Sequence, residues 1–340
     1  MDNYVRASIL KNFDDLVQRY GGNKEEFLEY VGIDKNIAGK SDKYISYSDF
    51  ILLLQQVEDK LGISRAGLHL GLMQNYRVLG PVAFLAIASE DIREAIYNTK
   101  SYFSQFSSVI AFDINSQSPP ELVFEFSASE CVDVVQAAEH TIAATLRVLE
   151  TVSGGACVPF CVQFCHERPE DGTDYESLLG CEVRFSQDQV AVALEESSLD
   201  IPISTADSEL KYLVSSYLTM QGIKQLKNNP RQTAFITKVF QIVNDLLPTG
   251  RATRSLVASA LNMHERSLHR RLTDYGQTFE AIVETIRRDK VQVLMAQPDL
   301  TMLEISQALG YHDQSSFNRA FKRWFGITPS QYASRARGGR

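Results

Sequence analysis

Residues 305–312 read Ile-Ser-Gln-Ala-Leu-Gly-Tyr-His, and residues 257–264 read Val-Ala-Ser-Ala-Leu-Asn-Met-His. Each stretch predicts a short helix ending in a tight turn, and an amphipathic stretch follows each one, over residues 265–275 and 314–325. Helix, short turn and helix make up the helix-turn-helix layout. We therefore expect two such units, over about residues 253–276 and 301–326, joined by a helix over about residues 279–296.

The second helix of each unit has a buried stripe and a polar face. Apolar residues recur at i, i+3, i+4 and i+7 in the later one and predict its stripe: Phe317, Ala320, Phe321 and Trp324. Its outer side carries Ser315, Arg319 and Lys322, with Asn318 at the flank. In the earlier helix, Leu268, Leu272 and Tyr275 face inward, and the outer side carries Arg266, His269, Arg270 and Thr273.

These outer faces suit DNA. Arginine bonds O6 and N7 of guanine in pairs, and asparagine and glutamine do the same to adenine. A lysine such as Lys322 is better suited to a phosphate. A linker helix of about 18 residues spans roughly 27 Å, so the two reading helices lie within reach of successive major grooves, about 34 Å apart. The alternative is a helical bundle with a basic surface and no DNA role.

The N-terminal and C-terminal parts of the chain carry net charges of opposite sign. Residues 231–340 hold 16 Lys and Arg against 9 Asp and Glu, whereas residues 1–230 hold 18 against 33. The formal net charge of −8 thus hides a basic C-terminal third, and such asymmetry indicates nucleic acid at one end.

Two cap motifs support the helix boundaries. Thr301 and Glu304 form the pattern of a capping box for the first helix of the second unit. Thr328 followed by Pro329 suits the start of a terminal helix.

The second unit resembles the signature of AraC/XylS-type transcription regulators. The matching residues are Ile305-Ser306, Leu309-Gly310-Tyr311, Asp313, Ser315, Phe317, Arg319-Ala320-Phe321-Lys322-Arg323, Phe325-Gly326-Ile327-Thr328-Pro329 and Tyr332, with Arg266-Ser267-Leu268 and Arg270-Arg271-Leu272 upstream. The likeness covers about residues 235–336. Two positions depart from it: Ser306 stands where the family usually has Ala, and His264 where it usually has Ser or Thr, which weakens the expected helix cap.

The resemblance implies a sequence-specific regulator, an activator, that binds double-stranded promoter DNA. Carried over by position, the base-reading candidates are Arg266, His269, Arg270, Gln314, Ser315, Asn318 and Arg319. The phosphate-binding candidates are Lys322 and Arg323. It further implies a homodimer, a small-molecule effector and RNA polymerase as partners, and no cofactor, metal or catalytic residue.

The N-terminal part predicts an α+β sensor or dimerisation domain over residues 1–205, followed by a helical linker over 206–232 and the DNA-binding domain over 233–340. Strands are expected at residues 109–114, 121–126, 158–165, 183–185 and 190–194, and a long helix at 134–152. The stretches Leu79-Gly80-Pro81, Val162–Pro169, Leu179–Phe185 and Leu199–Pro202 resemble the AraC subgroup whose N-terminal domain is labelled arabinose-binding-like. That label describes kinship and implies no particular ligand.

Several N-terminal residues carry a structural and a functional interpretation. Cys157, Cys161 and Cys165 lie four apart and would share one face of a strand, as core residues or as a thiol site. His140 and His166 are interpreted as hydrogen-bonded structural histidines. Tyr76 and Arg77 could face an anionic effector or make a loop contact.

Composition excludes some classes. The 340 residues are 44% hydrophobic and 22% charged, as in globular proteins with two domains. The longest apolar run, residues 81–88, is too short for a membrane helix, and we expect a bacterial cytoplasmic protein, associated with the nucleoid when bound to DNA. Five cysteines without a Cys-x-x-Cys pair favour reduced thiols.

Two rival functions remain. One is a regulator whose N-terminal domain only oligomerises and binds no ligand. The other is a DNA-repair alkyl-acceptor enzyme, for which no Pro-Cys-His motif is present.

Overall fold

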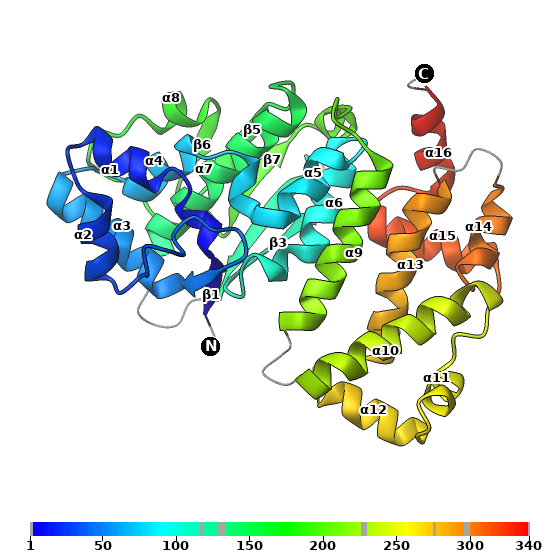
Figure 1. The fold of residues 1–340 in the computed structure, drawn as a ribbon. Coiled ribbons are helices and arrows are strands. Elements are labelled where there is room, and N and C mark those ends of the chain that lie inside the picture. Colours follow the sequence, from blue (N-terminus) through cyan, green and yellow to red (C-terminus); the bar gives the residue numbers. More distant parts are fainter. Residues whose placement is uncertain are drawn as a thin grey trace. The chain divides into compact units, whose positions relative to one another are not determined.

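The computed structural model describes residues 3–115, 119–127, 134–225, 230–274, 277–295 and 300–338. The chain divides into two compact units, Met1–Ala206 and Asp207–Arg340 (Figure 1). The first is α+β and the second is helical throughout its described residues, which confirms the predicted fold class. No helix among the described residues has the length and apolar character that a membrane span needs.

A sheet of five strands forms one layer of the N-terminal unit. Its order is β3 (Ile110–Asn115), β4 (Glu121–Phe126), β7 (Val190–Leu194), β5 (Pro159–Gln163) and β6 (Glu182–Arg184). Neighbours are antiparallel except for β5 and β6, which are parallel. Strand β7 is buried along its whole length, as expected for a central strand covered on both faces. A small second sheet pairs β1 (Tyr4–Arg6) with β2 (Tyr44–Ser46).

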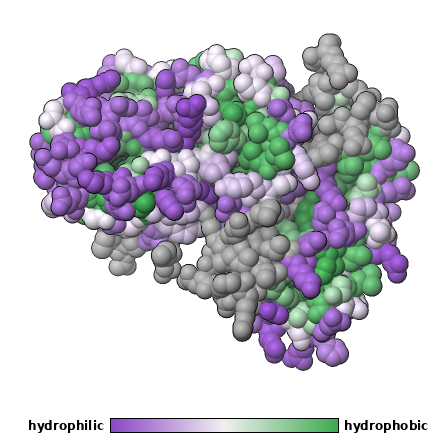
Figure 2. Space-filling model, viewed as in Figure 1, coloured by the Kyte–Doolittle hydropathy of each residue, from purple (hydrophilic) through white to green (hydrophobic). Residues whose placement is uncertain are grey.

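Helices make up the rest of the N-terminal unit. Their bounds are α1 (Phe13–Arg19), α2 (Lys24–Tyr30), α3 (Tyr47–Leu61), α4 (Ala66–Met73), α5 (Ala83–Ala88), α6 (Ile92–Tyr102), α7 (Val134–Ser153) and α8 (Tyr175–Leu179). Helix α4 packs closely along α7 through glycine. A Cβ on Gly71 would lie 2.7 Å from the backbone oxygen of His140. Any residue other than glycine would therefore clash with α7 at this position. In the view of Figure 2, hydrophilic side chains cover most of the surface over α1, α2 and α3.

One sequence prediction for the cysteines is wrong. Cys157 and Cys161 are buried, but Cys165 is exposed. The physical reason is that β5 ends at Gln163, so the alternation that would place all three on one face does not continue to Cys165. Among the described residues no group of His, Cys, Asp and Glu has the arrangement of a metal site.

His140 on α7 is a buried, hydrogen-bonded residue. Its Nε2 lies 3.0 Å from Oε1 of Gln74. The amide nitrogen of Gln74 donates to the carbonyl oxygens of Ile9 and Lys11, so Oε1 is the atom that faces the ring. Because an amide oxygen only accepts, Nε2 of His140 carries the proton. Burial lowers the pKa of His140 to about 3, and the ring is neutral at physiological pH.

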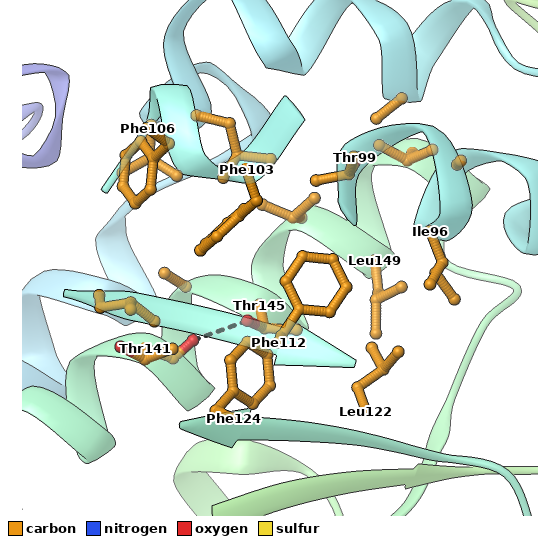
Figure 3. A pocket seen from close by; sticks show the side chains of 18 of the residues that line it. Ile96, Thr99, Phe103, Phe106, Phe112, Leu122, Phe124, Thr141, Thr145 and Leu149 are labelled. Carbon is orange, nitrogen blue, oxygen red and sulfur yellow. Dashed lines mark hydrogen bonds between the residues drawn. The ribbon is translucent and has the colours of Figure 1, made fainter. Parts of the chain in front are cut away.

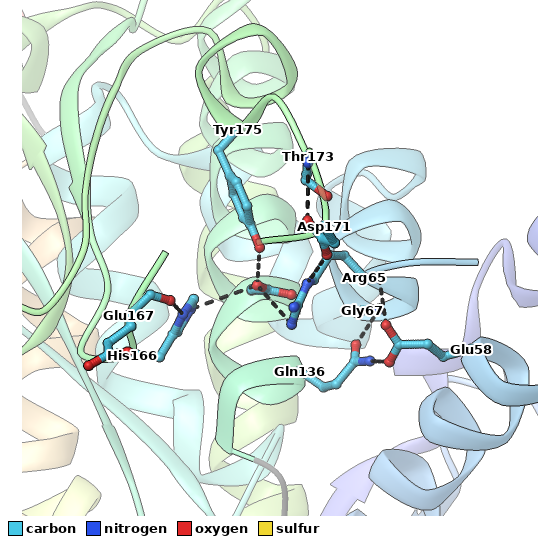
Figure 4. A network of polar contacts seen from close by, with 10 residues as sticks. Glu58, Arg65, Gly67, Gln136, His166, Glu167, Asp171, Thr173 and Tyr175 are labelled. Carbon is cyan, nitrogen blue, oxygen red and sulfur yellow. Dashed lines mark hydrogen bonds and ion pairs between the residues drawn. The ribbon is translucent and has the colours of Figure 1, made fainter. Parts of the chain in front are cut away.

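A buried carboxylate, Glu139, contacts Tyr175, Arg65 and His166, three members of the polar network in Figure 4. The hydroxyl of Tyr175 donates to its Oε1, and Arg65 Nη1 and His166 Nε2 lie 3.9 and 3.7 Å from that atom. Arg65 also pairs with Asp171 at 2.8 Å. Burial raises the pKa of Glu139 to about 7, against the opposing effects of the Tyr175 hydrogen bond and the Arg65 charge.

The C-terminal unit is a series of helices. They are α9 (Ser208–Gln225), α10 (Pro230–Leu246), α11 (Arg254–Ala260), α12 (Glu265–Thr273), α13 (Phe279–Met295), α14 (Met302–Ala308), α15 (Gln314–Phe325) and α16 (Pro329–Gly338), with a 3₁₀ turn at Leu247–Thr249. One apolar core lies among α10, α11, α12 and the start of α13, and a second lies among the end of α13, α14, α15 and α16. Some residues of the predicted segments lie outside the described residues. They are 226–229 in the predicted linker, 275–276 in the first unit and 296 in the linker helix.

Candidate nucleic-acid interface

Two helix-turn-helix pairs form the candidate interface, α11 with α12 and α14 with α15. Their turns match residue for residue. Asn262 (φ 53°) lies two residues after the first helix of one pair and Gly310 (φ 67°) two residues after that of the other, both in the left-handed region. Glycine enters this region without strain, and asparagine is among the few other residues that tolerate it. The shared backbone conformation explains why Asn and Gly occupy equivalent positions in the sequence repeat.

Helix α12 presents a cationic face to solvent. Leu268 and Leu272 are fully buried and hold the helix against the first core. The predicted base-reading residues Arg266, His269 and Arg270 are all exposed. Hydrophilic side chains gather over this helix at the lower edge of the view in Figure 2. The cap residue His264 makes no side-chain cap hydrogen bond, so the first turn of α12 lacks the bond that a serine or threonine there would supply.

Helix α15 has the predicted stripe. Phe317, Ala320, Phe321 and Trp324 are buried in the second core. Asp313 caps the helix by accepting hydrogen bonds from the backbone nitrogen and the hydroxyl of Ser316, at 2.7 and 2.8 Å. These bonds hold the pKa of Asp313 below its usual range, so the cap is ionised at neutral pH. The caps predicted at Thr301 and Thr328 are also present.

The sequence-predicted residues of α15 differ in how far they reach solvent. Ser315, Arg319 and Lys322 are exposed, whereas Gln314 and Asn318 are half-buried. Nη2 of Arg319 donates to the hydroxyl of Ser316 at 2.9 Å, which directs the guanidinium toward the start of the helix. Oδ1 of Asn318 is buried and has no hydrogen-bond partner in the described part of the chain. Its amide oxygen is therefore less accessible to a base than the arginine beside it.

Arg323, a predicted phosphate ligand, is held by an acid within the protein. Its Nη2 lies 2.7 Å from Oε1 of Glu284 on α13, and Nε1 of Trp324 donates to the same oxygen at 2.7 Å. Burial opposes the charge of Glu284, but the hydrogen bonds from Trp324 and Arg323 outweigh it and lower the pKa of Glu284. The pair joins the reading helix α15 to the linker helix α13.

Arg287, for which no sequence motif predicts a role, makes a second connection between α13 and the later helix-turn-helix. Its Nε and Nη2 donate to the carbonyl oxygens of Leu309 and Gly310, each at 2.8 Å, and its guanidinium lies 4.1 Å from the ring centre of Tyr311. These carbonyls belong to the end of α14, where a helix leaves its last acceptors without partners. Arg287 thus supplies hydrogen-bond donors to the carbonyl oxygens of the turn between α14 and α15.

The same turn touches the first half of the unit. A Cβ on Gly310 would lie 2.7 Å from the carbonyl oxygen of Leu247, in the turn after α10. Arg254 of α11 also pairs with Glu280 of α13. No sequence signal marks these partners, because they lie 26 and 63 positions apart and have no periodic relation.

Two family models match the chain. The N-terminal arabinose-binding domain of AraC transcription regulators matches residues 21–203, and a helix-turn-helix domain matches residues 257–335. The HTH-type transcriptional regulator VirS of Mycobacterium tuberculosis is 28% identical over 342 residues, covering 100% of this chain and 98% of that protein. The ornithine utilization regulator of Pseudomonas aeruginosa is 23% identical over 331 residues, covering 94% and 93%.

Among solved structures, the transcriptional regulator CdpR of Pseudomonas aeruginosa matches with a TM-score of 0.45 and 21% identity, covering 94% of this chain and 98% of that one. The matched families and the two sequence relatives above are transcription regulators, not enzymes.

Proposed function

The chain belongs to the AraC family of DNA-binding transcription regulators, and from that premise we propose that it reads two successive major grooves of promoter DNA and activates transcription. The observation that carries the proposal is the pair of equivalent helices, α12 and α15, each buried along one face and exposing cationic or polar donors along the other. Helix α13 between them has 17 residues, a length of roughly 25 Å. That length suits two helices in adjacent turns of the same duplex face.

We assign base reading to Arg266, His269 and Arg270 on α12. On α15 we assign it to Gln314, Ser315, Asn318 and Arg319. Arg319 is the strongest of these, because it is exposed and its guanidinium is directed by Ser316. A bidentate arginine contact distinguishes guanine from other bases by about 1–3 kcal/mol.

Phosphate binding falls to Lys322 and Arg323. Lys322 is exposed on α15 and would contact the phosphate backbone of DNA as a point charge. Arg323 keeps its pair with Glu284 while its side chain remains 63% exposed, so a phosphate can share it. Neutralising a phosphate releases counterions, which makes the affinity depend on salt.

The N-terminal domain, residues 1–205, is proposed to control the DNA-binding domain, residues 233–340, through the linker 206–232 that the sequence predicts to be helical. Control by a small-molecule effector and assembly as a homodimer are part of this proposal, as is contact with RNA polymerase at the promoter. Linked binding of two chains would raise the affinity for a repeated site without new contacts to each half. The family model for residues 21–203 supports the effector.

A footprint of the full-length protein on DNA upstream of its own and neighbouring genes tests the proposal. We expect protection of two adjacent major grooves on one face of the duplex, with a steep loss of affinity as salt rises. Equal affinity for promoter and random DNA would contradict sequence-specific reading.

A further inference from the structure

A cavity of about 90 Å³ lies inside the N-terminal unit, between helices α6 and α7 and the sheet strands β3 and β4 (Figure 3). Four phenylalanines line it, Phe103, Phe106, Phe112 and Phe124, and aliphatic side chains make up most of the remaining wall. Phe103 and Phe112 meet edge to face with their ring centres 4.9 Å apart. Small-molecule sites in proteins are apolar pockets of this kind with a few placed polar groups.

The wall carries no formal charge. No Asp, Glu, Lys or Arg is among the described residues that line the cavity, and its histidine, His140, is neutral because burial lowers its pKa. A carboxylate or ammonium ligand would lose its hydration here without gaining a counter-charge. The hydroxyls of Thr99, Thr141 and Thr145 and the ring nitrogen Nδ1 of His140 are too few partners for a sugar, since every buried hydroxyl that stays unpaired costs free energy.

The hydroxyl of Thr141 is buried without a partner in the described part of the chain, and so is Nδ1 of His140 in the same wall. Thr141 lies on α7 and is 6% exposed. By contrast, Thr145 one turn later donates its hydroxyl to the backbone oxygen of Thr141 at 2.8 Å. A buried polar atom left without a partner is uncommon in proteins and calls for an explanation such as a ligand.

We propose that this cavity binds a small, uncharged and largely apolar molecule with a single hydroxyl, about the size of phenol, whose hydroxyl bonds to Thr141. The aromatic wall packs the apolar body, and Thr141 supplies the hydrogen bond to the hydroxyl. The role of this ligand as the effector rests on the proposed sensor function. Its binding to the cavity does not depend on that function. The proposed ligand therefore belongs to a different chemical class from the sugar that the family label names.

Calorimetric titration of the full-length protein with phenol, benzene, benzoate and L-arabinose tests the assignment. We expect phenol to bind roughly three- to ten-fold more tightly than benzene, the increment of one net hydrogen bond. Benzoate and arabinose should give no heat of binding. Absence of phenol binding, or tighter binding of benzoate or arabinose than of phenol, would overturn the proposal.

The variant Thr141→Val keeps the side-chain shape and removes the hydroxyl. It should bind benzene as the wild type does and lose the preference for phenol. Thr151→Val, which removes an exposed hydroxyl on the same helix, is the matched control and should keep that preference. A preference retained by Thr141→Val would refute the contact, and binding of benzene by that variant shows at once that it is folded.

A second readout separates this site from the regulatory role. Phenol at saturation should change the affinity of the protein for its footprinted DNA, and Thr141→Val should weaken the response. If phenol binds as described but leaves DNA affinity unchanged, the ligand site stands and the sensor function fails.

Discussion

At the scale of single residues, the burial pattern of the candidate interface is visible in the sequence. The buried stripe of α15 and the exposed Arg319 follow from helical periodicity alone. Periodicity does not reveal which polar side chains are already used inside the protein. Asn318 and Arg323 have the residue types of DNA ligands, yet one has a buried oxygen and the other is paired with Glu284.

Removing Arg319 should relax specificity. Arg319→Ala is expected to weaken binding to the preferred site by about 1–3 kcal/mol and to remove the preference at one base pair. Lys322→Ala is the matched comparison, because it should weaken all sequences alike and lower the salt dependence by about one unit. Equilibrium binding to specific and random duplexes measures both. An identical loss on the two duplexes for Arg319→Ala would show that Arg319 reads no base.

Gly310 should tolerate no side chain. Gly310→Ala places a Cβ 2.7 Å from the carbonyl oxygen of Leu247 at a positive φ, and we expect a loss of more than 1 kcal/mol in the free energy of unfolding. Asn262→Gly, at the equivalent turn, should change stability by a few tenths of a kcal/mol. Urea unfolding of both variants provides the test, and equal stability of Gly310→Ala and the wild type would be the contradicting outcome.

Glu139 should make stability depend on pH. Its pKa is about 7 in the folded protein against 4.5 for a free glutamate, so the folded state holds its proton more tightly. That contribution to the free energy of unfolding is complete below pH 4.5 and is lost as pH rises through 7. Tyr175, Arg65, Asp171, Glu58 and His166 are the groups that face or surround it.

Urea unfolding at pH 5.5 and 7.5 measures this effect. Between these two pH values the free energy of unfolding of the wild type should fall by about 2 kcal/mol more than that of Glu139→Gln, since the amide does not titrate. If wild type and variant depend on pH equally, the pKa of Glu139 is not raised.

At the scale of elements, the sequence predicts helices, strands and caps well because each depends on neighbours within a few positions. The strands at 121–126 and 190–194 have the predicted bounds, and the capping box at Thr301 is present. The prediction for Cys165 was wrong because the end of β5 is set by tertiary pairing with β6 and β7. Helix-to-helix contacts such as Arg287 with the end of α14 are absent from any local pattern.

Arg287 should act as a positioning residue for the second helix-turn-helix. Arg287→Met keeps the aliphatic stem but leaves the Leu309 and Gly310 carbonyls without their donors. We expect weaker protection at the half-site read by α15 and unchanged protection at the half-site read by α12. Arg288→Met, its neighbour on α13, is the control. Equal weakening at both half-sites would indicate a general loss of stability instead.

At the scale of the whole molecule, the division into an acidic N-terminal part and a basic C-terminal part predicts where DNA binds, since charge is summed directly from the sequence. The cavity could not be predicted in this way. Its wall comes from α6, α7, β3 and β4, and its character depends on Thr141 lacking a partner, which only the assembled fold reveals.

The central claim, that α12 and α15 read two successive grooves on one face of DNA, is tested most directly by moving the half-sites. Inserting five base pairs between them turns one half-site to the opposite face of the duplex. Because α13 and the contacts of Glu284 and Arg287 fix α15, we expect the affinity of the full-length protein to fall at least about ten-fold and one half-site to lose its footprint. Unchanged affinity with both half-sites still protected would contradict the account.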